Sequence, residues 1–266
     1  MGEPVKIDAV VLRDSMCSTR ITTMLVTMPK FLVAQFNTHR AFSRNSASSR
    51  AIPMAKVREQ VRREPYIPTE WPSAQKGMLG GPPLRGKNAE AAAFEWMTVR
   101  EEALAAHAQM ERVGVAKEIA NRLLEPFMWT QVIVTATDWE GFFQQRLPGH
   151  GAQGEMQQVA LRMQQALHAS MPGLLHPGQW HLPLADDFLT DEQALWQSAA
   201  RCARVSYKRQ AVETTIEQDK ERHDMLITEG HWSPLEHQAM ALITPKRERN
   251  FTGWRQYRAV KDGADD

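Results

Sequence analysis

The chain has 266 residues, of which 42% are hydrophobic and 24% are charged, and its formal net charge is +1. These proportions are typical of a globular protein with one large or two small domains, and the small net charge gives no reason to expect duplex DNA binding. No apolar run approaches the ~20 residues of a membrane span, and Met1–Asp8 has no apolar signal core. Two cysteines without CxxC spacing, Cys17 and Cys202, indicate a reducing, cytoplasmic setting without a disulfide framework or a metal site.

The first part of the chain predicts short strands followed by a long loop. Residues 5–12 and 21–26 cluster aliphatic side chains and are predicted strands, whereas residues 31–36, after Pro29, fit a strand or the first turn of a helix. Short connections favour antiparallel pairing of these neighbours. Residues 53–88 are rich in proline and glycine and predict a long loop.

Helices dominate the rest of the chain, and capping residues, glycine or proline mark many of their ends. The first predicted elements are a helix over 89–108 that Asn88 caps, a helix over 115–124 that Pro126 ends, and a strand or buried helix over 128–137. A helix over 139–145 follows the N-cap pair Thr137 and Asp138, and an amphipathic helix over 153–169 and a loop over 171–184 come next. Two helices with capping boxes complete the prediction: one runs from Thr190 and Gln193 through Arg204, and the other from Thr214 and Glu217 through Glu229, followed by Gly230.

The stretch 35–50 is the strongest candidate for a binding site. It contains three arginines, one histidine, four serines and two asparagines, and it contains no acid. Arginine forks, hydroxyls and backbone N–H groups of a turn suit an anionic ligand. A solvated polar loop is the alternative, but the stretch follows the apolar, strand-like run 31–34 directly and ends in Ala51-Ile52-Pro53.

A second candidate is the turn 230–237, with the sequence Gly-His-Trp-Ser-Pro-Leu-Glu-His after a predicted helix. Two histidines and an acid could suggest a metal, but zinc needs further spaced ligands and none is evident. The alternative is a helix-connecting turn with structural hydrogen bonds. Two more segments contain basic residues that could bind an anion: 142–156 with Arg146 and His150, and 114–126 with Arg122. By itself Arg146 could equally be a surface residue, as most single arginines are.

Together these segments resemble the flavin-dependent thymidylate synthases. That family carries Arg-His-Arg-x-x-Ser-x-Asn-Glu-x-Ser-x-Arg-Tyr with a glutamine three residues before it, and its positions depart here at Thr38, Ser46 and Ala51. The matching residues are Gln35, His39, Arg40, Ser43, Asn45, Ser48 and Arg50.

Three further segments strengthen the resemblance. The family's Gly-His-x-Ser-Pro-Phe-Glu-His matches 230–237, and its Ala-Arg-Val-Ser-aromatic segment matches 203–207. Its arginine followed by His-Ala-Gln-x-Glu-Ile matches 146–156, with one extra residue, Gly151. Its Gly-Val-x-Arg-Glu-x-Ala-Arg-x-x-x-Pro matches 114–126; read back from the proline, Arg122 takes the place of the second arginine, although Asn121 is an alternative.

The order of the segments differs from that of the family, in which the segments matched by 203–237 precede the Arg-His-Arg motif. We therefore interpret residues 1–266 as a single, circularly permuted domain with the family's first portion at about 196–242. This interpretation predicts that Leu242 lies close to the strand that contains Ile21, and that the two ends of the chain lie near each other.

The resemblance implies an α+β fold with a small antiparallel sheet flanked by long helices, in a homotetramer whose active sites lie between subunits. It implies reductive methylation of dUMP to dTMP, with methylenetetrahydrofolate as carbon donor, FAD as hydride carrier and NADPH as reductant, and it needs no cysteine nucleophile. The implied catalytic residues are Arg146 and Ser48. Substrate-binding residues would be Gln35, Ser48, Ser49, Arg50, Arg122 and Arg146, and FAD-binding residues His39, Arg40, Asn45, His150, His231 and Ser233.

Two other functions compete with this one. The departures from the motif also fit a related flavoenzyme that modifies C5 of another pyrimidine nucleotide. A non-catalytic nucleotide-binding homologue would keep the fold alone. Outside the resemblance, the aromatic and basic run 250–258 could add a strand, reach the nucleotide of a neighbouring subunit, or form a terminal amphipathic helix.

Overall fold

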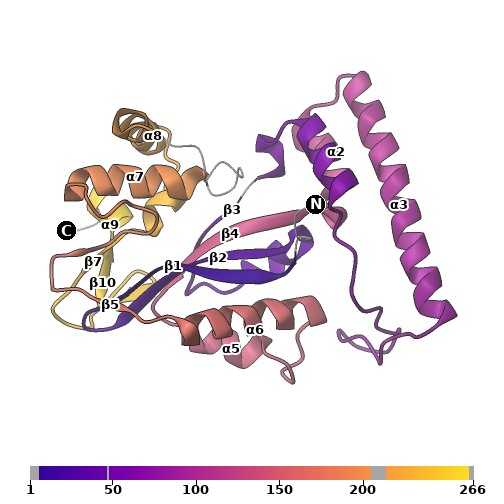
Figure 1. The fold of residues 1–266 in the computed structure, drawn as a ribbon, viewed down its shortest axis with the longest axis horizontal. Coiled ribbons are helices and arrows are strands. Elements are labelled where there is room, and N and C mark those ends of the chain that lie inside the picture. The colour runs from indigo at the N-terminus through magenta and orange to yellow at the C-terminus, as the bar shows by residue number, and fades with distance from the viewer. Residues whose placement is uncertain (1–5, 47, 205–213, 264–266) are drawn as a thin grey trace.

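A five-stranded sheet forms the centre of the computed structural model, which describes residues 6–46, 48–204 and 214–263. The strand order is β3-β4-β2-β1-β5 (Figure 1). Neighbouring strands are antiparallel, except β1 and β5, which run parallel. The predicted α+β fold with an antiparallel sheet is therefore confirmed. The strands are β1 (Asp8–Met16), β2 (Arg20–Pro29), β3 (Ser43–Ser46), β4 (Trp129–Ala136) and β5 (Gly173–Leu174).

One face of the sheet packs against α5 (Glu140–Arg146) and α6 (Gly154–Ala169), which lie below the sheet in Figure 1. On β2, Met24, Val26 and Met28 alternate toward this core, as side chains of period two must. Burial of each such aliphatic side chain contributes about 1.5–3 kcal/mol. The amphipathic helix predicted over 153–169 is confirmed, because its apolar positions are all buried: Met156, Val159, Ala160, Met163 and Leu167.

The C-terminal part of the chain covers the other side of the sheet, where α7 and α8 lie above it in Figure 1. It adds a three-stranded sheet of order β10-β7-β6 and a two-stranded sheet, β8-β9. Its elements are β6 (Trp180–His181), α7 (Asp191–Arg204), α8 (Ile216–Thr228), η5 (Ser233–Glu236), β7 (Ala239–Ala241), β8 (Arg247–Glu248), β9 (Phe251–Thr252), β10 (Trp254–Gln256) and α9 (Tyr257–Lys261).

A buried chain of four polar side chains ties this C-terminal part to the central strands. His237 Nδ1 lies 2.8 Å from Thr135 Oγ1, which lies 2.7 Å from Thr23 Oγ1. Thr23 Oγ1 in turn lies 2.8 Å from Nε2 of His181. Burial lowers the pKa of both histidines to about 3, so both rings are neutral near pH 7. These bonds satisfy polar groups that would be costly to bury unpaired.

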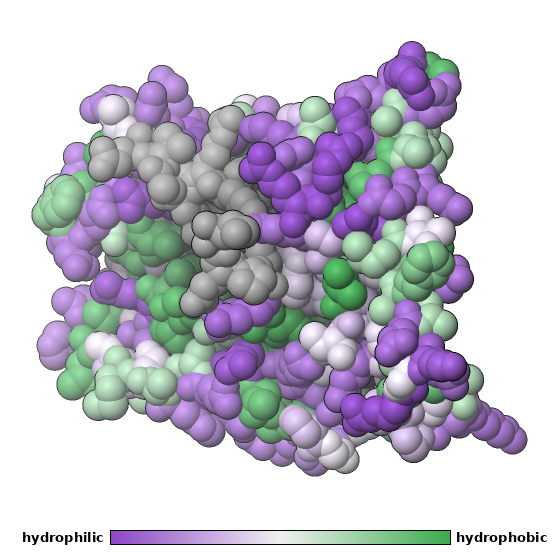
Figure 2. All heavy atoms as spheres, turned by 45° about the vertical axis from the view of Figure 1, so that its right-hand side comes forward, coloured by the Kyte–Doolittle hydropathy of each residue, from purple (hydrophilic) through white to green (hydrophobic). Residues whose placement is uncertain are grey.

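Helices α2 and α3 form a second small core beside the sheet. Val57 and Val61 of α2 pack there with Leu104 of α3, and α3 stands at the edge of the molecule (Figure 1). Figure 2, which brings this side forward, shows hydrophilic and hydrophobic residues interspersed on it. The helices of this region are η1 (Lys30–Leu32), α1 (Val33–Phe36), η2 (Ser49–Ala51), α2 (Met54–Arg63), α3 (Lys87–Arg112), α4 (Lys117–Ala120) and η3 (Asn121–Phe127).

Several predicted boundaries are wrong. The loop over 53–88 begins with the helix α2, because Met54, Val57 and Val61 lie on one buried face, and its prolines and glycines come later. Of the two alternatives predicted for residues 31–36, the helical one is confirmed. The second capping box lies one residue later than predicted: Thr215 accepts from the Gln218 backbone, and Gln218 bonds back. Its predicted stop is confirmed, since Gly230 has a φ of 69° after the C-cap.

Two further segments differ in part from their predictions. Pro126 does not end its helix but lies inside the 3₁₀ helix η3, which replaces the α ladder where proline provides no N–H. The tail 250–258 forms both a strand and a short helix, β10 and α9. Among the described residues no helix has the length and apolar character needed to cross a membrane, and no three His, Cys, Asp or Glu side chains cluster as a metal site would need.

The segments that the permutation would join lie side by side. Ile21 packs with Ala239 and Ala241, and Cys17 Sγ donates to Leu242 O at 3.7 Å. The permutation itself stays a proposal.

The described ends of the chain, in contrast, are far apart in the fold. At the N-terminal end, Asp8 pairs with Thr27, near the end of β2. At the C-terminal end, α9 follows β10, whose Trp254 donates to Thr19 O, just before β2 begins. The prediction that the chain ends lie near each other is therefore wrong for the described residues. A permutation requires only that the old ends meet, so the new ends are not constrained.

Candidate functional site

A cavity of about 560 Å³ lies between the donor-rich stretch and the turn after α8. Asn45 connects its two walls: Asn45 Nδ2 donates to Cys202 O at 3.0 Å, and Ser233 Oγ donates to Asn45 Oδ1 at 3.4 Å. The cavity thus brings together two segments that the sequence analysis proposed independently. The residues around it are Asn45, Ser46, Ser48, Arg50 and Ala51 on one side, and Ala203, Arg222, Met225, Leu226, Glu229, His231, Ser233 and Pro234 on the other.

The donors around this cavity are largely uncommitted. Among the described residues, Arg50 has neither a hydrogen bond nor an ion pair, and Arg222 has only a contact of 3.6 Å to Met225 Sδ. The one acid in the lining, Glu229, lies 3.1 Å from His231 Nε2. Two guanidinium groups and several hydroxyls that face one cavity form a site for an anion such as a phosphate or a diphosphate.

His39, Arg40 and Arg146 meet at a different place, beside a cavity of about 430 Å³ that Thr38, His39 and Arg40 line together with Phe142. Arg146 Nε donates to His39 Nε2 at 3.0 Å, and Arg146 Nη2 lies 3.5 Å from Thr38 Oγ1. Burial, followed by the charges of Arg146 and Arg44, lowers the pKa of His39 to about 4. His39 is therefore neutral near pH 7 and can accept the bond from Arg146.

Ser49 and Arg122, both expected to bind the nucleotide, share a carboxylate instead. Ser49 is buried and its Oγ donates to Glu125 Oε1 at 2.6 Å, while Arg122 Nη1 lies 3.3 Å from the same oxygen. The Arg122 side chain is 62% exposed. The alternative to Arg122 in the family alignment, Asn121, is fully buried.

The remaining expected residues lie outside both cavities. Gln35 Nε2 donates to Gln153 Oε1 at 3.2 Å, and His150 is exposed. The structure of the single chain therefore unites Asn45, Ser48 and Arg50 with His231 and Ser233. It unites His39 and Arg40 with Arg146 elsewhere. The upstream match at 203–207 is described only for Ala203 and Arg204, because residues 205–207 lie outside the described residues.

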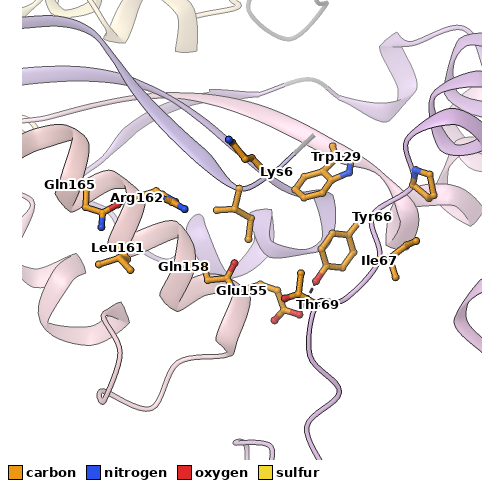
Figure 3. Close-up of a pocket in the computed structure, with 12 residues that line it drawn as sticks. Lys6, Tyr66, Ile67, Thr69, Trp129, Glu155, Gln158, Leu161, Arg162 and Gln165 are labelled. Carbon is orange, nitrogen blue, oxygen red and sulfur yellow. Dashed lines mark hydrogen bonds between the residues drawn. The ribbon is translucent and has the colours of Figure 1, made fainter. Parts of the chain in front are cut away.

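A third cavity, also about 430 Å³, lies between α6, from Glu155 to Gln165, and residues 65–69 (Figure 3). Tyr66 Oη donates to Glu155 Oε1 at 2.8 Å, and the Tyr66 and Trp129 rings meet edge to face at 5.3 Å. Burial, followed by the charge of Glu155, raises the pKa of Tyr66. No residue that lines this cavity was predicted to bind a ligand.

Arg222 is the functional candidate that the sequence analysis missed. It faces the anion cavity from α8, on the same helical face as Met225 and Glu229. The spacing of three and seven residues along a predicted helix is the signal that could have revealed it, because such residues lie on one face.

Comparison with known proteins assigns the chain to a family. A family model described as thymidylate synthase complementing protein matches residues 15–173. A search of curated proteins found no match. Among solved structures, the UMP/dUMP methylase PolB from Streptomyces cacaoi bound with 5-Br UMP is 19% identical with a TM-score of 0.49, covering 61% of this chain and 88% of that one. The same enzyme bound with 5-Br dUMP gives 21% identity and a TM-score of 0.46, covering 56% of this chain and 65% of that one.

The family match spans more than half of the chain and contains the donor-rich stretch, the segment with Arg122 and the segment with Arg146. The turn 230–237, which lies outside the match, completes the cavity that this stretch opens. The chain therefore belongs to the family of thymidylate synthase complementing proteins, the flavin-dependent thymidylate synthases that its motifs resemble.

Proposed function

We propose that this protein catalyses the FAD-dependent reductive methylation of a pyrimidine nucleoside monophosphate at C5, with dUMP as substrate and dTMP as product. Methylenetetrahydrofolate would supply the carbon and NADPH the reducing equivalents. The observation that carries the proposal is the cavity at which Ser48 and Arg50 meet His231 and Ser233. Residues so far apart in sequence form one anion site, and each falls on a position that the family uses for nucleotide or flavin.

The donor set fits a flavin dinucleotide. A diphosphate needs several hydrogen-bond donors close together, and Arg222 and His231 offer them beside the Ser233 hydroxyl. Asn45, His231 and Ser233 would hold FAD at this cavity, and His39 and Arg40 would hold another part of it, contributed by the same or another subunit. When bound, FAD supplies the hydride chemistry, whereas the protein supplies position and charge.

The residues of the chain itself would perform binding and orientation. Arg50 and Ser48 would bind the nucleotide phosphate through charge-assisted and hydroxyl hydrogen bonds. Arg146 would orient the pyrimidine, since its Nε donates to the neutral His39 and its Nη2 lies 3.5 Å from Thr38 Oγ1, and both partners line the cavity. The separation of the Arg50 and Arg146 sites within one protomer supports an active site completed by a second copy of the chain.

A second substrate remains a candidate because of one observation. Ser46, which replaces the family's glutamate, lines the anion cavity directly. Loss of a carboxylate there removes a hydrogen-bond acceptor and a negative charge from the place where base and flavin should meet. The pyrimidine accepted could then differ from uracil, as in dCMP, or the sugar could be ribose, as in UMP.

Product analysis tests the proposal. The purified protein is incubated with FAD, NADPH and methylenetetrahydrofolate and with dUMP, UMP or dCMP in parallel, and the nucleotide products are separated and weighed by mass spectrometry. A mass gain of one CH2 on dUMP, as expected when a methyl group replaces the hydrogen on C5, supports the proposed reaction. The same gain on UMP or dCMP alone supports the second substrate. A protein that remains colourless after incubation with excess FAD and methylates none of the three nucleotides would contradict both.

A further inference from the structure

Asn121 holds the turn that carries Arg50. This fully buried side chain donates through Nδ2 to Ser49 O at 2.7 Å and to Ile52 O at 3.0 Å. The two carbonyls flank Arg50 on either side, so one amide group fixes both ends of the 3₁₀ turn η2. Ser49 Oγ adds a third tie through its bond of 2.6 Å to Glu125.

The orientation of this amide follows from the next two side chains. His107, also fully buried, has its Nε2 2.9 Å from Asn121 Oδ1 and its Nδ1 3.2 Å from Arg58 Nη1. A guanidinium can only donate, so His107 Nδ1 must accept, and the ring proton must reside on Nε2. Nε2–H then donates to Asn121 Oδ1, which leaves Nδ2 as the group that faces the two carbonyls.

The outer end of this chain is fixed as well. Arg58 forms an ion pair with Glu111 of α3, and its side chain is 17% exposed. The series Glu111, Arg58, His107 and Asn121 therefore runs from the surface of α3 through α2 to the anion-binding turn. Along this series Arg58 donates to Glu111 and to His107, and His107 donates to Asn121. A hydrogen-bond network whose members are all satisfied makes the segments that it contacts more rigid.

We propose that Asn121, oriented by His107 and Arg58, is a positioning residue that holds the Ser48–Arg50 turn in the conformation that binds the phosphate of the nucleotide. This inference rests on the proposed function, because it assumes that Arg50 contacts the phosphate. The role of Asn121 is then to shape the turn rather than to touch the ligand. Neither Asn121 nor His107 lines the anion cavity.

A double-mutant cycle separates positioning from a general structural role. Dissociation constants for dUMP and for inorganic pyrophosphate are measured by titration calorimetry on the full chain, loaded with FAD, for wild type, Asn121→Ala, Arg50→Ala and the double variant. Asn121→Ala should weaken binding by about tenfold or more, since misplaced contacts of the order of 1 Å are costly. In the Arg50→Ala background the same change should have little further effect, because its effect runs through Arg50.

Trp96→Phe serves as the matched control. Trp96 lies on α3, as His107 does, and donates to a backbone carbonyl, Tyr66 O at 3.0 Å. It has no hydrogen bond to the four residues Glu111, Arg58, His107 and Asn121, which we call the clamp. It should lower the melting temperature without changing either dissociation constant. Should Asn121→Ala fail to fold, Arg58→Met, at the more exposed end of the chain, replaces it with the same expected direction and a smaller effect.

The outcomes distinguish the two proposals. The clamp is refuted if folded Asn121→Ala or Arg58→Met binds both probes as tightly as wild type does. It is also refuted if the losses in affinity of the two single variants add up in the double variant. Either result would leave the proposed function intact. Binding of pyrophosphate but not of dUMP would contradict the proposed substrate. The double-mutant cycle measured with pyrophosphate would then still test the clamp. A wild type that binds neither probe would contradict both.

Discussion

Replacement of Arg50 by alanine is the sharpest test of the anion cavity. Within the described residues Arg50 has neither a hydrogen bond nor an ion pair, and its side chain is exposed. Its removal should therefore leave the free energy of unfolding within about 0.5 kcal/mol of wild type, as surface substitutions usually do. A loss of binding affinity in this variant would therefore reflect a lost contact to the ligand and not a loss of stability.

The expected cost to binding is set by charge-assisted hydrogen bonds to phosphate. One such bond contributes about 1.5–3 kcal/mol, which corresponds to a roughly 10- to 150-fold rise in the dissociation constant for dUMP. Arg50→Lys keeps the charge but loses the planar fork, so its dissociation constant should fall between the two. Arg122→Ala should cost less than Arg50→Ala, because Glu125 already engages the Arg122 guanidinium at 3.3 Å.

Titration calorimetry with dUMP measures these constants, and thermal unfolding of the same preparations controls for stability. A dissociation constant for Arg50→Ala within twofold of wild type, in a variant with unchanged melting temperature, would refute the assignment of this residue to the phosphate. Equal losses for Arg122→Ala and Arg50→Ala would refute the argument from the Glu125 ion pair, although not the site itself.

Three further predictions follow from the same structure. Arg40→Ala should lower the flavin-to-protein absorbance ratio with an unchanged circular dichroism spectrum, because Arg40 lines an open cavity; equal ratios would remove it from the flavin site. Arg222→Ala should weaken nucleotide or FAD binding by about tenfold in calorimetry, whereas Lys220→Ala, on the same helix and paired with Asp224, should not. The free energy of unfolding should be full above pH 6.5 and fall toward pH 3, because burial lowers the pKa of His181 and His237 from 6.5 to about 3 in the folded state. Between these pH values two such groups lower the free energy of unfolding by about 2.7 kcal/mol for each pH unit. Urea titrations at several pH values should show about half of this pH dependence in His237→Gln.

Local patterns predicted most of the elements that position the site. The apolar spacing of 153–169 gave the helix α6, and the glycine at 230 marked the stop that starts the site turn. Family motifs then identified Asn45, Ser48 and Arg50 together with His231 and Ser233, and the structure places these five around one cavity. Helix α2 was missed because the composition of the whole 53–88 segment hid three apolar residues on one helical face.

Single long-range contacts lay beyond reach of the sequence. Nothing in the local pattern indicates that Arg146 bonds His39 apart from the anion cavity, or that Ser49 faces Glu125 rather than solvent. The choice between Asn121 and Arg122 could not be made from spacing either. It depends on which side chain is buried against the turn, and burial is decided by how α3 and η3 pack. Such contacts carry no periodicity, so no reading of one segment reveals them.

The wide separation of the cavity walls has a consequence for the synthesis of the protein. The hydrogen bond between Asn45 and Ser233 joins residues 188 positions apart. At about 5–20 residues per second, a ribosome needs roughly 10 to 40 s to pass from the first wall to the second. During that interval the central hairpin lacks the cover that α7, α8 and His237 later provide, and the apolar side of Ile21 faces the nascent-chain environment. The anion cavity can therefore form only after residues 222–234 have been synthesised, so chaperone access and refolding yield should depend strongly on these residues.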